Sequence, residues 1–527
     1  MSIFQLFQLS ARDDQQQRSQ SFHQRSAIDV LCVFVLVLYF LYFALPAVGG
    51  HLADDEIPEL YRYWYFGSLK WVWANICFWR ETVTFFRPGG VFYYAPLYHC
   101  FGLNPRPYHI AQISIFAASI PMLYYLTRSL SSSRSVAFLA VLALCYHVKL
   151  ISLVFRGSFS YDVLCGFFYF GAFTYYVYFR ERDVQLRPLQ LVGFFVLYIC
   201  ALDFKEMAVT LPVVVLIYEV LKSPRWGDWK EFIRWGYSSM IPALIAGLIT
   251  AVYIYGRIHG PTSLAMKGHY RPQYSWSTFL EANASFVSQL FYGVSISKQG
   301  LLALWALVFI YAFLHRDRML RLMAFWVVIV PLPLAFIVPI RGGGHLYLLL
   351  FGWAMIFAKV ASDLIELLCK FSLLIRRTAT GRVRGAAVGD AANPTAGKMS
   401  QATFRIIATL VVAFSLALFT RWQNRPSIVR AFQNLGQKTS HVAQAIRSLD
   451  FRPAPGSTIL VKGNPFIPGQ GWNSLFIPAL VWNDHSLRIW LDGLNKLTPQ
   501  ELATVDYVIF LSEFRAEIVR VPESQQH

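Results

Sequence analysis

The sequence predicts an all-α polytopic membrane protein with about eleven membrane-spanning helices, followed by a small α/β domain. Of the 527 residues, 56% are hydrophobic and 14% are charged, whereas a soluble domain carries about a quarter charged residues. Apolar runs of about 20 residues, the length needed to cross the hydrocarbon of a bilayer, recur along the chain as far as residue 420. The remaining residues carry shorter amphipathic and strand-like patterns. Together these observations predict a membrane bundle with a separate C-terminal domain.

The apolar runs are the predicted spans. We interpret the first run as a retained span, because no small-residue cleavage site of a signal peptide precedes the acidic residues that follow it. The predicted spans cover residues 28–49, 109–127, 135–154, 161–179, 188–203, 207–221, 237–256, 299–314, 321–340, 345–368 and 402–420.

The connections between the spans predict the orientation. Every second connection is basic, for example "FRERDVQLR" at 179–187, and basic loops face the cytoplasm. The N-terminus (1–27) and a Gly/Ala-rich linker (371–401) are therefore expected to be cytoplasmic, and the loops 50–108 and 257–298 external. Because the basic residues lie between apolar runs, the net charge of +18 does not indicate nucleic-acid binding.

Residues 421–527 are expected to form an extracytoplasmic α/β domain after the membrane part, which covers 28–420. The domain begins with an amphipathic segment at 427–449. Three short β-type runs follow: "STILVKG", "SLRIWL" and "DYVIFL". The short N-terminus, the internal linker and a C-terminal domain without cysteines favour a bacterial inner membrane.

An acidic cluster follows the first span in "HLADDEIPELYRYW" (51–64), where Asp54, Asp55 and Glu56 are consecutive. At the water–membrane boundary the lowered dielectric raises the pKa of a carboxylate towards the range of a useful base. The alternative is a solvated N-terminus of the next helix, with Glu59 in its first turn. From these residues alone, both interpretations stay open.

The stretch "FFRPGGVFYYAPLYHCFGLNPRPYHIAQI" (85–113) resembles the membrane part of the transmembrane and tetratricopeptide-repeat O-mannosyltransferases and of bacterial relatives in the GT-C superfamily. Its matching positions are Arg87-Pro88, Gly102-Leu103-Asn104-Pro105 and Tyr108-His109. Four other places agree in order, namely Asp54-Asp55, Asp162 in "RGSFSYDVLCGFFYF", Lys205-Glu206 in "FKEMAVTLP", and Arg341 in "RGGGHLYLLLFG". The chain departs from the pattern at Arg156, which is displaced, at Phe204, which replaces a serine, and in lacking the repeat array.

The resemblance implies a GT-C-like fold and a glycosyltransferase that takes a sugar from a lipid phosphate, with a catalytic carboxylate in the first external loop. Such a transfer needs a base for the acceptor hydroxyl and cations for the leaving phosphate. The expected base is Asp54 or Asp55, the expected phosphate ligands are Arg87, Lys205, Arg341 and His345, and the expected supporting residues are Glu56, Asp162, Glu206 and His109. The expected partners are a polyprenyl-phosphate sugar donor, membrane lipid and an acceptor that is a glycan, a lipid or a protein. Whether a divalent metal takes part is open.

Several of these residues have a second interpretation. The three glycines after Arg341 permit close backbone approach to a phosphate, but the same segment is also typical of a flexible turn. Lys205 and Glu206 either form a structural ion pair or place Lys205 on the donor phosphate. The loop 257–298 is either a mobile lid or an interfacial helix at "STFLEANASFVSQLF".

The alternative function is a transporter or lipid flippase. Such proteins carry charges inside their spans and are built from two similar halves. Here the charges lie at the predicted external ends of the spans, the connections are unequal, and a separate domain ends the chain. These features favour the transferase.

Overall fold

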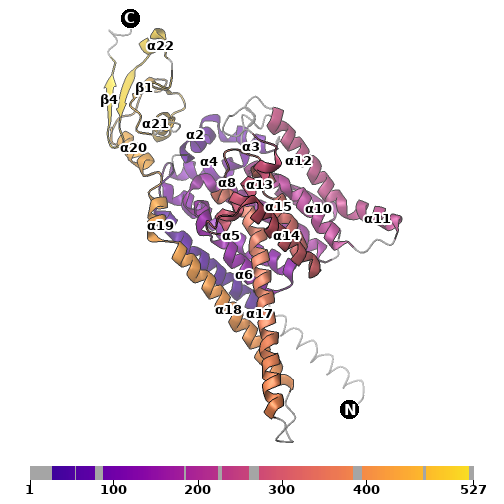
Figure 1. Cartoon of the computed structure of the whole chain (residues 1–527). Coiled ribbons are helices and arrows are strands. Elements are labelled where there is room, and N and C mark those ends of the chain that lie inside the picture. Colours follow the sequence, from indigo (N-terminus) through magenta and orange to yellow (C-terminus); the bar gives the residue numbers. More distant parts are fainter. Residues whose placement is uncertain are drawn as a thin grey trace, which may run out of the picture.

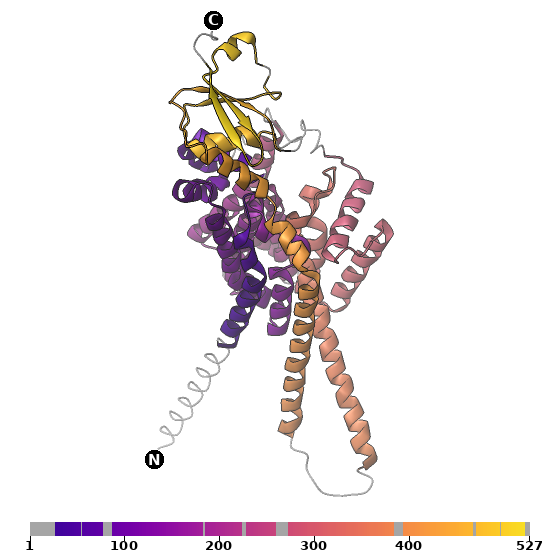
Figure 2. The same ribbon diagram turned by 90° about the vertical axis from the view of Figure 1, so that its left-hand side faces the viewer.

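The computed structural model describes residues 27–53, 55–76, 87–182, 185–223, 228–259, 272–383, 394–466, 471–495 and 497–521. Helices form one bundle, and a four-stranded sheet domain lies at one end of it, close to α2 (Glu56–Phe66) and α4 (Val91–Phe101) (Figure 1). We call this end the C-domain end. The long helices α17 (Tyr347–Val383) and α18 (Pro394–Gln423) run side by side away from it and project beyond the bundle (Figure 2).

The predicted all-α polytopic fold is confirmed. In the described part of the chain, six helices are long and apolar enough to cross a membrane: Ala27–Gly49, Pro105–Ser131, Ile241–Ile258, Arg318–Ala335, Gly343–Phe371 and Gln401–Gln423. The other predicted spans fall on helices that are shorter or less apolar, namely α6 (Arg134–Cys145), α8 (Ser160–Arg180), α9 (Pro188–Phe204), α10 (Leu211–Lys222) and α14 (Lys298–Leu314).

Smaller elements connect the long helices. They are η1 (Leu45–Gly49), α3 (Ser68–Ile76), η2 (Pro88–Gly90), η5 (Glu206–Thr210), α11 (Trp229–Trp235), η6 (Gly236–Met240), α13 (Trp276–Leu290), α16 (Leu332–Ala335) and η9 (Gly343–Leu346). The bundle also contains α5 (Pro105–Ser131), α12 (Ile241–His259) and α15 (Arg318–Ile329). The helix expected at "STFLEANASFVSQLF" is present as α13, while residues 260–271 of the same predicted loop lie outside the described residues.

The predicted span over 135–154 is wrong in its second half. Helix α6 ends at Cys145, and the chain continues as the short turns η3 (Val148–Leu150), α7 (Ser152–Phe155) and η4 (Gly157–Phe159). Tyr146 and His147 have extended backbone that ends the helix, and the apolar run after them is buried in the bundle, so its hydropathy resembles that of a span. This irregular segment brings Arg156 to the C-domain end.

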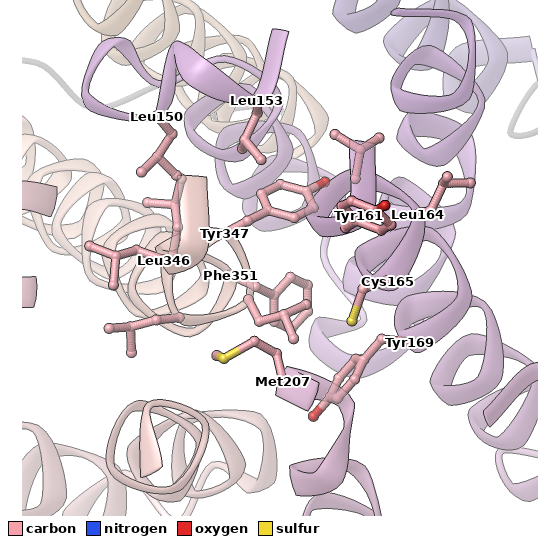
Figure 3. Packing of buried hydrophobic residues seen from close by; sticks show 14 of the residues in the cluster. Leu150, Leu153, Tyr161, Leu164, Cys165, Tyr169, Met207, Leu346, Tyr347 and Phe351 are labelled. Carbon is pink, nitrogen blue, oxygen red and sulfur yellow. The ribbon is translucent and has the colours of Figure 1, made fainter. Parts of the chain in front are cut away.

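The core beneath this end is built by α8 and α17. Tyr347 and Phe351 of α17 lie opposite Tyr161, Cys165 and Tyr169 of α8 (Figure 3). Close approach of the two helices depends on Gly166, where a β-carbon would lie 2.7 Å from the Tyr347 ring. Packing of large buried aromatics fixes the two helices, and therefore fixes the residues at their N-terminal ends.

The C-terminal α/β domain is confirmed as well. Its sheet has the order β2 (Arg488–Leu491), β1 (Thr458–Lys462), β3 (Tyr507–Leu511), β4 (Ala516–Arg520). The central strand β1 pairs in parallel with β2 and β3, with Leu460 opposite Trp490 and Val508, and β3 and β4 are antiparallel. The helices of this part are α19 (Pro426–Gln433), α20 (Gln437–Arg447), α21 (Asn473–Trp482) and α22 (Pro499–Ala503).

Contacts from several elements attach this domain to the bundle. Tyr61 of α2 stacks on Phe476 of α21 with the ring centroids 4.2 Å apart. His51, which follows the first span, places its Nδ1 atom 2.8 Å from the hydroxyl of Ser440 in α20. The domain is therefore held against the segment that carries the acidic cluster.

Candidate functional site

The candidate site is at the C-domain end, where several helices start or stop. Asp162 lies in the first turn of α8, and Lys205 follows the last residue of the antiparallel neighbour α9. Glu206 begins η5, and His345 lies in η9, directly before α17. Residues far apart in the sequence therefore meet in one layer.

Asp55 forms an ion pair with the Arg156 guanidinium, and both side chains keep contact with solvent. Asp55 occupies the position before α2, yet its side chain makes no capping hydrogen bond. Its carboxylate is thus directed to a cation of another segment, which the helix-cap interpretation does not account for. Asp54 lies outside the described residues.

Glu56 is buried, with only 1% of its surface exposed. Its Oε1 atom accepts a hydrogen bond from the Ser158 amide at 3.1 Å. Space for the carboxyl group exists because residue 157 is a glycine, where a β-carbon would lie 2.8 Å from the Glu56 carboxyl carbon. Burial, reinforced by the neighbouring Asp55 charge, raises the pKa of Glu56 to about 8.

This raised pKa predicts a pH-dependent stability. Between the ordinary pKa of 4.5 and about 8, the folded protein keeps a proton on Glu56 that the unfolded chain has released, so stability falls as the pH rises through this window. The side chain in Glu56→Gln is neutral at every pH. The thermal midpoint of this variant, relative to that of the wild type, should therefore rise as the pH is raised from about 5 to about 9. Glu281→Gln, which removes an exposed carboxylate, is the control; equal pH profiles for the wild type and Glu56→Gln would contradict this account.

A second group joins Lys205, Asp162 and His345. The Lys205 ammonium lies 2.6 Å from both carboxylate oxygens of Asp162 and 2.6 Å from His345 Nδ1. His345 Nδ1 is also 3.2 Å from an Asp162 oxygen. The side chains of Lys205 and Asp162 are 2% and 5% exposed, while His345 is 26% exposed. This group therefore presents the imidazole, and not the ammonium, to the solvent side.

A third group centres on Glu206. Its two carboxylate oxygens bind Arg87 at 3.0 Å and Arg257 at 3.3 Å. The interpretation of Lys205 and Glu206 as an ion pair with each other is therefore wrong: the chain changes direction between α9 and η5, and the two side chains enter different groups. Because the two residues are consecutive, they join the second group to the third.

Arg87 is held by a cluster of tyrosines. Its backbone is in the left-handed region with φ of 55°, which costs a residue with a β-carbon about 1–2 kcal/mol. The Tyr63 hydroxyl donates to the Arg87 carbonyl at 2.6 Å, and Tyr161 donates to Glu59 at 2.6 Å. The Arg87 guanidinium lies over the Tyr161 ring, 5.2 Å from its centroid. Strained backbone that the surroundings enforce is typical of functional sites.

Phe159 connects the first and second groups. The Arg156 guanidinium lies 5.4 Å and the Lys205 ammonium 5.9 Å from the centroid of its ring, and the His345 ring lies 5.0 Å from it. Gly344 permits this arrangement, because a β-carbon there would lie 2.3 Å from Phe159. One of the three glycines after Arg341 thus serves close packing of η9 against η4.

Arg341 and His109 are the other two residues predicted for the site. Arg341 is half-buried and lies two residues before η9, in a segment where Gly343 donates its amide to Gln289 at 3.1 Å. His109 is buried in α5 beneath η1, where a β-carbon on Gly50 would lie 3.2 Å from its ring. His109 takes part in none of the ion pairs found among the described residues.

Sequence reasoning did not assign Arg156, Arg257 or Phe159 to the site. Arg156 was visible only as a displaced member of its motif, and it proves to be the partner of Asp55. Arg257 at the end of α12 gave a signal only as one of several basic residues in a long loop. As for a metal, the described residues contain no group of three or more His, Cys, Asp or Glu side chains suited to hold an ion.

Taken together, the helical bundle, the loops gathered at one end and the small terminal domain define a polytopic membrane protein. The chain is similar in structure to ArnT from Cupriavidus metallidurans, solved in the apo state (TM-score 0.52, 12% identity, covering 95% of this chain and 99% of ArnT). It is also similar to the same protein bound to undecaprenyl phosphate (TM-score 0.50, 12% identity, covering 94% and 98%). No family model and no curated protein sequence matches the chain. At 12% identity, the likeness concerns the fold.

Proposed function

We propose that this protein is a glycosyltransferase that moves a sugar from a polyprenyl-phosphate donor to an acceptor on the extracytoplasmic face. The observation that carries the proposal is that three groups of charged side chains lie together at one end of the bundle. The first of these groups contains Asp55, and all three contain cations. Among the described residues, this end of the bundle gathers the cations Arg87, Arg156, Lys205 and Arg257 beside the carboxylates Asp55, Asp162 and Glu206. Guanidinium groups bind the oxygens of a phosphate through paired hydrogen bonds. The ArnT structure with undecaprenyl phosphate adds support from the fold.

In this proposal Asp55 is the general base. It takes the proton of the acceptor hydroxyl while the hydroxyl oxygen attacks the anomeric carbon of the sugar. The bond from that carbon to the phosphate oxygen breaks, and polyprenyl phosphate leaves with the electron pair. Arg156 holds the carboxylate in position until substrate binds, since an Asp55 carboxylate paired only with solvent would sample many directions.

The leaving phosphate is assigned to Arg87, Arg257, Arg341 and His345. Arginine binds phosphate oxygens bidentately, and Arg87 and Arg257 are aligned by one shared carboxylate, Glu206. Lys205 is buried against Asp162, so we assign it to positioning His345 and revise its expected role as a direct ligand. Glu56 and His109 support the backbone around Asp55.

The remaining assignments are also proposals. The charge pattern of the connections supports a cytoplasmic N-terminus and linker (371–401), external loops 50–108 and 257–298, and an extracytoplasmic domain over 421–527. A bacterial inner membrane fits this arrangement. The acceptor is a glycan, a lipid or a protein.

The test is release of polyprenyl phosphate by the purified full chain in nanodiscs. We expect the wild type to release it from at least one member of a panel of polyprenyl-phosphate hexoses and pentoses, and Arg87→Ala to release it at least about a hundredfold more slowly. Arg515→Ala, which removes an exposed arginine of the C-terminal domain, is the matched control. Movement of the intact donor lipid from one leaflet to the other in sealed proteoliposomes, without release in nanodiscs, would indicate the transporter instead.

A further inference from the structure

A cavity of about 400 Å³ lies between the end of the first span (Ala27–Gly49) and the junction of α18 with α19. Its described lining contains no residue of the three ionic groups. Sites for small ligands have volumes of about 300–1,000 Å³. The lining combines two arginines, two amides and aromatic side chains: Tyr42, Phe43, Arg421, Asn424, Arg430 and Gln433.

Contacts between several elements fix the walls of this cavity. Gln433 of α19 donates its side-chain amide to the Pro46 carbonyl at 2.7 Å. Tyr146 donates its hydroxyl to the side-chain oxygen of Asn424 at 3.0 Å, and its ring stacks on Phe43 with the centroids 4.8 Å apart. Because the oxygen of Asn424 accepts this hydrogen bond, its amide hydrogens are the atoms that it offers to a ligand. The cavity thus has a fixed shape where α19 leads from α18 towards the C-terminal domain (Figure 1).

The cavity is positively charged. Arg421 and Arg430 line it, and the described lining contains no carboxylate. Neither arginine belongs to an ion pair found in the described part of the chain. Residues 421–449 carry five lysines and arginines and no aspartate or glutamate. In the orientation proposed above this is the extracytoplasmic end of the spans, where basic residues are the less frequent. The charge therefore favours an anionic ligand.

The cavity lies at the depth of the lipid headgroups. The first span and the apolar part of α18 (Gln401–Gln423) each contain 23 residues. A helix of this length extends about 34 Å, which is close to the thickness of about 30 Å of the hydrocarbon core. The two helices run in the same direction, because towards their other ends Asp29 pairs with Arg134 and Thr409 donates to the next residue, Ser135. Their last turns therefore meet at one boundary of the hydrocarbon, and the arginines lie there.

Exposed apolar side chains lead from the cavity along both helices. On the first span, Leu38 lies one turn before Tyr42, and both side chains are exposed. On α18, Phe414 and Leu418 are exposed and precede Arg421 by seven and three positions, which places the three residues on one face of the helix. A soluble anion would leave these faces uncovered, whereas the acyl chains of a lipid cover them. The ligand that fits both the charge and the apolar faces is a phospholipid.

We propose that this cavity binds the headgroup of an anionic diacyl phospholipid of the surrounding membrane. Arg421 and Arg430 bind the phosphate oxygens through paired hydrogen bonds, and the Asn424 amide donates to a further headgroup oxygen. The acyl chains lie along the exposed faces of the two helices. The bound lipid links α19 to the first span and so holds the connection to the C-terminal domain in place. This binding does not depend on the proposed transferase function.

The test is photolabelling of the full chain in phosphatidylcholine nanodiscs that contain a small fraction of a probe lipid with a diazirine in one acyl chain. The probe is either phosphatidylglycerol or phosphatidylcholine, and the ratio of labelling by the two probes is measured. On residues 410–422 we expect this ratio to exceed that on the exposed helix α14 at least about tenfold. Arg421→Gln/Arg430→Gln should lower it to the ratio of α14. The matched control Arg488→Gln/Arg515→Gln removes two exposed arginines outside the cavity and should keep the wild-type ratio.

Both arginines of the cavity are exposed, so Arg421→Gln/Arg430→Gln should stay folded and monodisperse. Equal ratios on residues 410–422 and on α14 in the wild type, or a wild-type ratio in this double variant, overturn the lipid site. If inorganic phosphate abolishes the preference and chloride of the same ionic strength does not, the cavity binds free phosphate and the proposal is wrong. If polyprenyl phosphate abolishes it and unlabelled phosphatidylglycerol does not, the cavity belongs to the donor lipid and the proposal is also wrong.

Discussion

Asp55→Asn should abolish most of the sugar transfer while leaving the protein folded. A positioned general base contributes about 10²–10⁴-fold to a rate, and Asn keeps the shape of the side chain but cannot take a proton. We therefore expect release of polyprenyl phosphate in the presence of acceptor to fall by about 10²–10⁴-fold. The side chain is partly exposed, so the thermal midpoint should change little. The measurement is the rate of release by matched amounts of monodisperse protein.

Two variants make this result specific. Asp54→Asn changes the neighbouring carboxylate, which lies outside the described residues, and we expect a much smaller loss because Asp55 is the residue that pairs with Arg156. Asp492→Asn removes an exposed carboxylate of the C-terminal domain and controls for the loss of one charge. If Asp55→Asn keeps full activity, the base is assigned to the wrong residue. The same conclusion follows if Asp54→Asn is inactive while Asp55→Asn is active.

The largest effect on stability is expected at the pair of Lys205 and Asp162. Their side chains are 2% and 5% exposed, and removing one member of a buried ion pair costs about 3–5 kcal/mol, because the other charge is left buried. Lys205→Met and Asp162→Asn should each lower the thermal midpoint strongly or prevent folding. The double variant Lys205→Met/Asp162→Asn buries no charge at this place, so it should recover most of the lost stability. Thermal midpoints from size-exclusion chromatography provide the measurement.

A solvent-accessible pair serves as the comparison. Lys438 and Glu513 of the C-terminal domain lie 3.8 Å apart, with 36% and 32% of their side chains exposed. Such pairs contribute about 0–1 kcal/mol, so Lys438→Met and Glu513→Gln should hardly change the midpoint. Wild-type stability in Lys205→Met, or a double variant less stable than both single variants, would contradict the role given to the buried pair.

The architecture was predictable from the sequence because it depends on local patterns. Long apolar runs mark the spans by their length alone, and the short runs of apolar, largely β-branched or aromatic residues in "STILVKG" and "DYVIFL" mark β1 and β3. Strand β4 was missed, since "AEIVR" mixes polar and apolar residues at the edge of the sheet. The predicted span over 135–154 was too long, because buried irregular segments are as apolar as membrane helices.

The pairing within the site was not predictable, because it depends on tertiary packing. Asp55 and Arg156 are 101 positions apart, and the adjacent residues Lys205 and Glu206 enter different groups. Glu56 follows two aspartates and suggests a solvated side chain, yet the absence of a side chain at Gly157 leaves room for its burial. Short motifs thus identified residues that the structure brings together at one end of the bundle, while the pairs that these residues form required the three-dimensional structure.

The central claim is that Asp55 of the first loop activates the acceptor hydroxyl while Arg87, Arg257 and His345 bind the phosphate of the same lipid-linked donor. The most direct test is an electron cryomicroscopy structure of the full chain in nanodiscs with polyprenyl phosphate. We expect the phosphate at the C-domain end, within hydrogen-bond distance of Arg87 or Arg257 and of His345, with Asp55 on the side from which a hydroxyl would attack. A phosphate bound at the opposite end of the bundle, or beyond the reach of Arg87, Arg257 and His345, would contradict the claim.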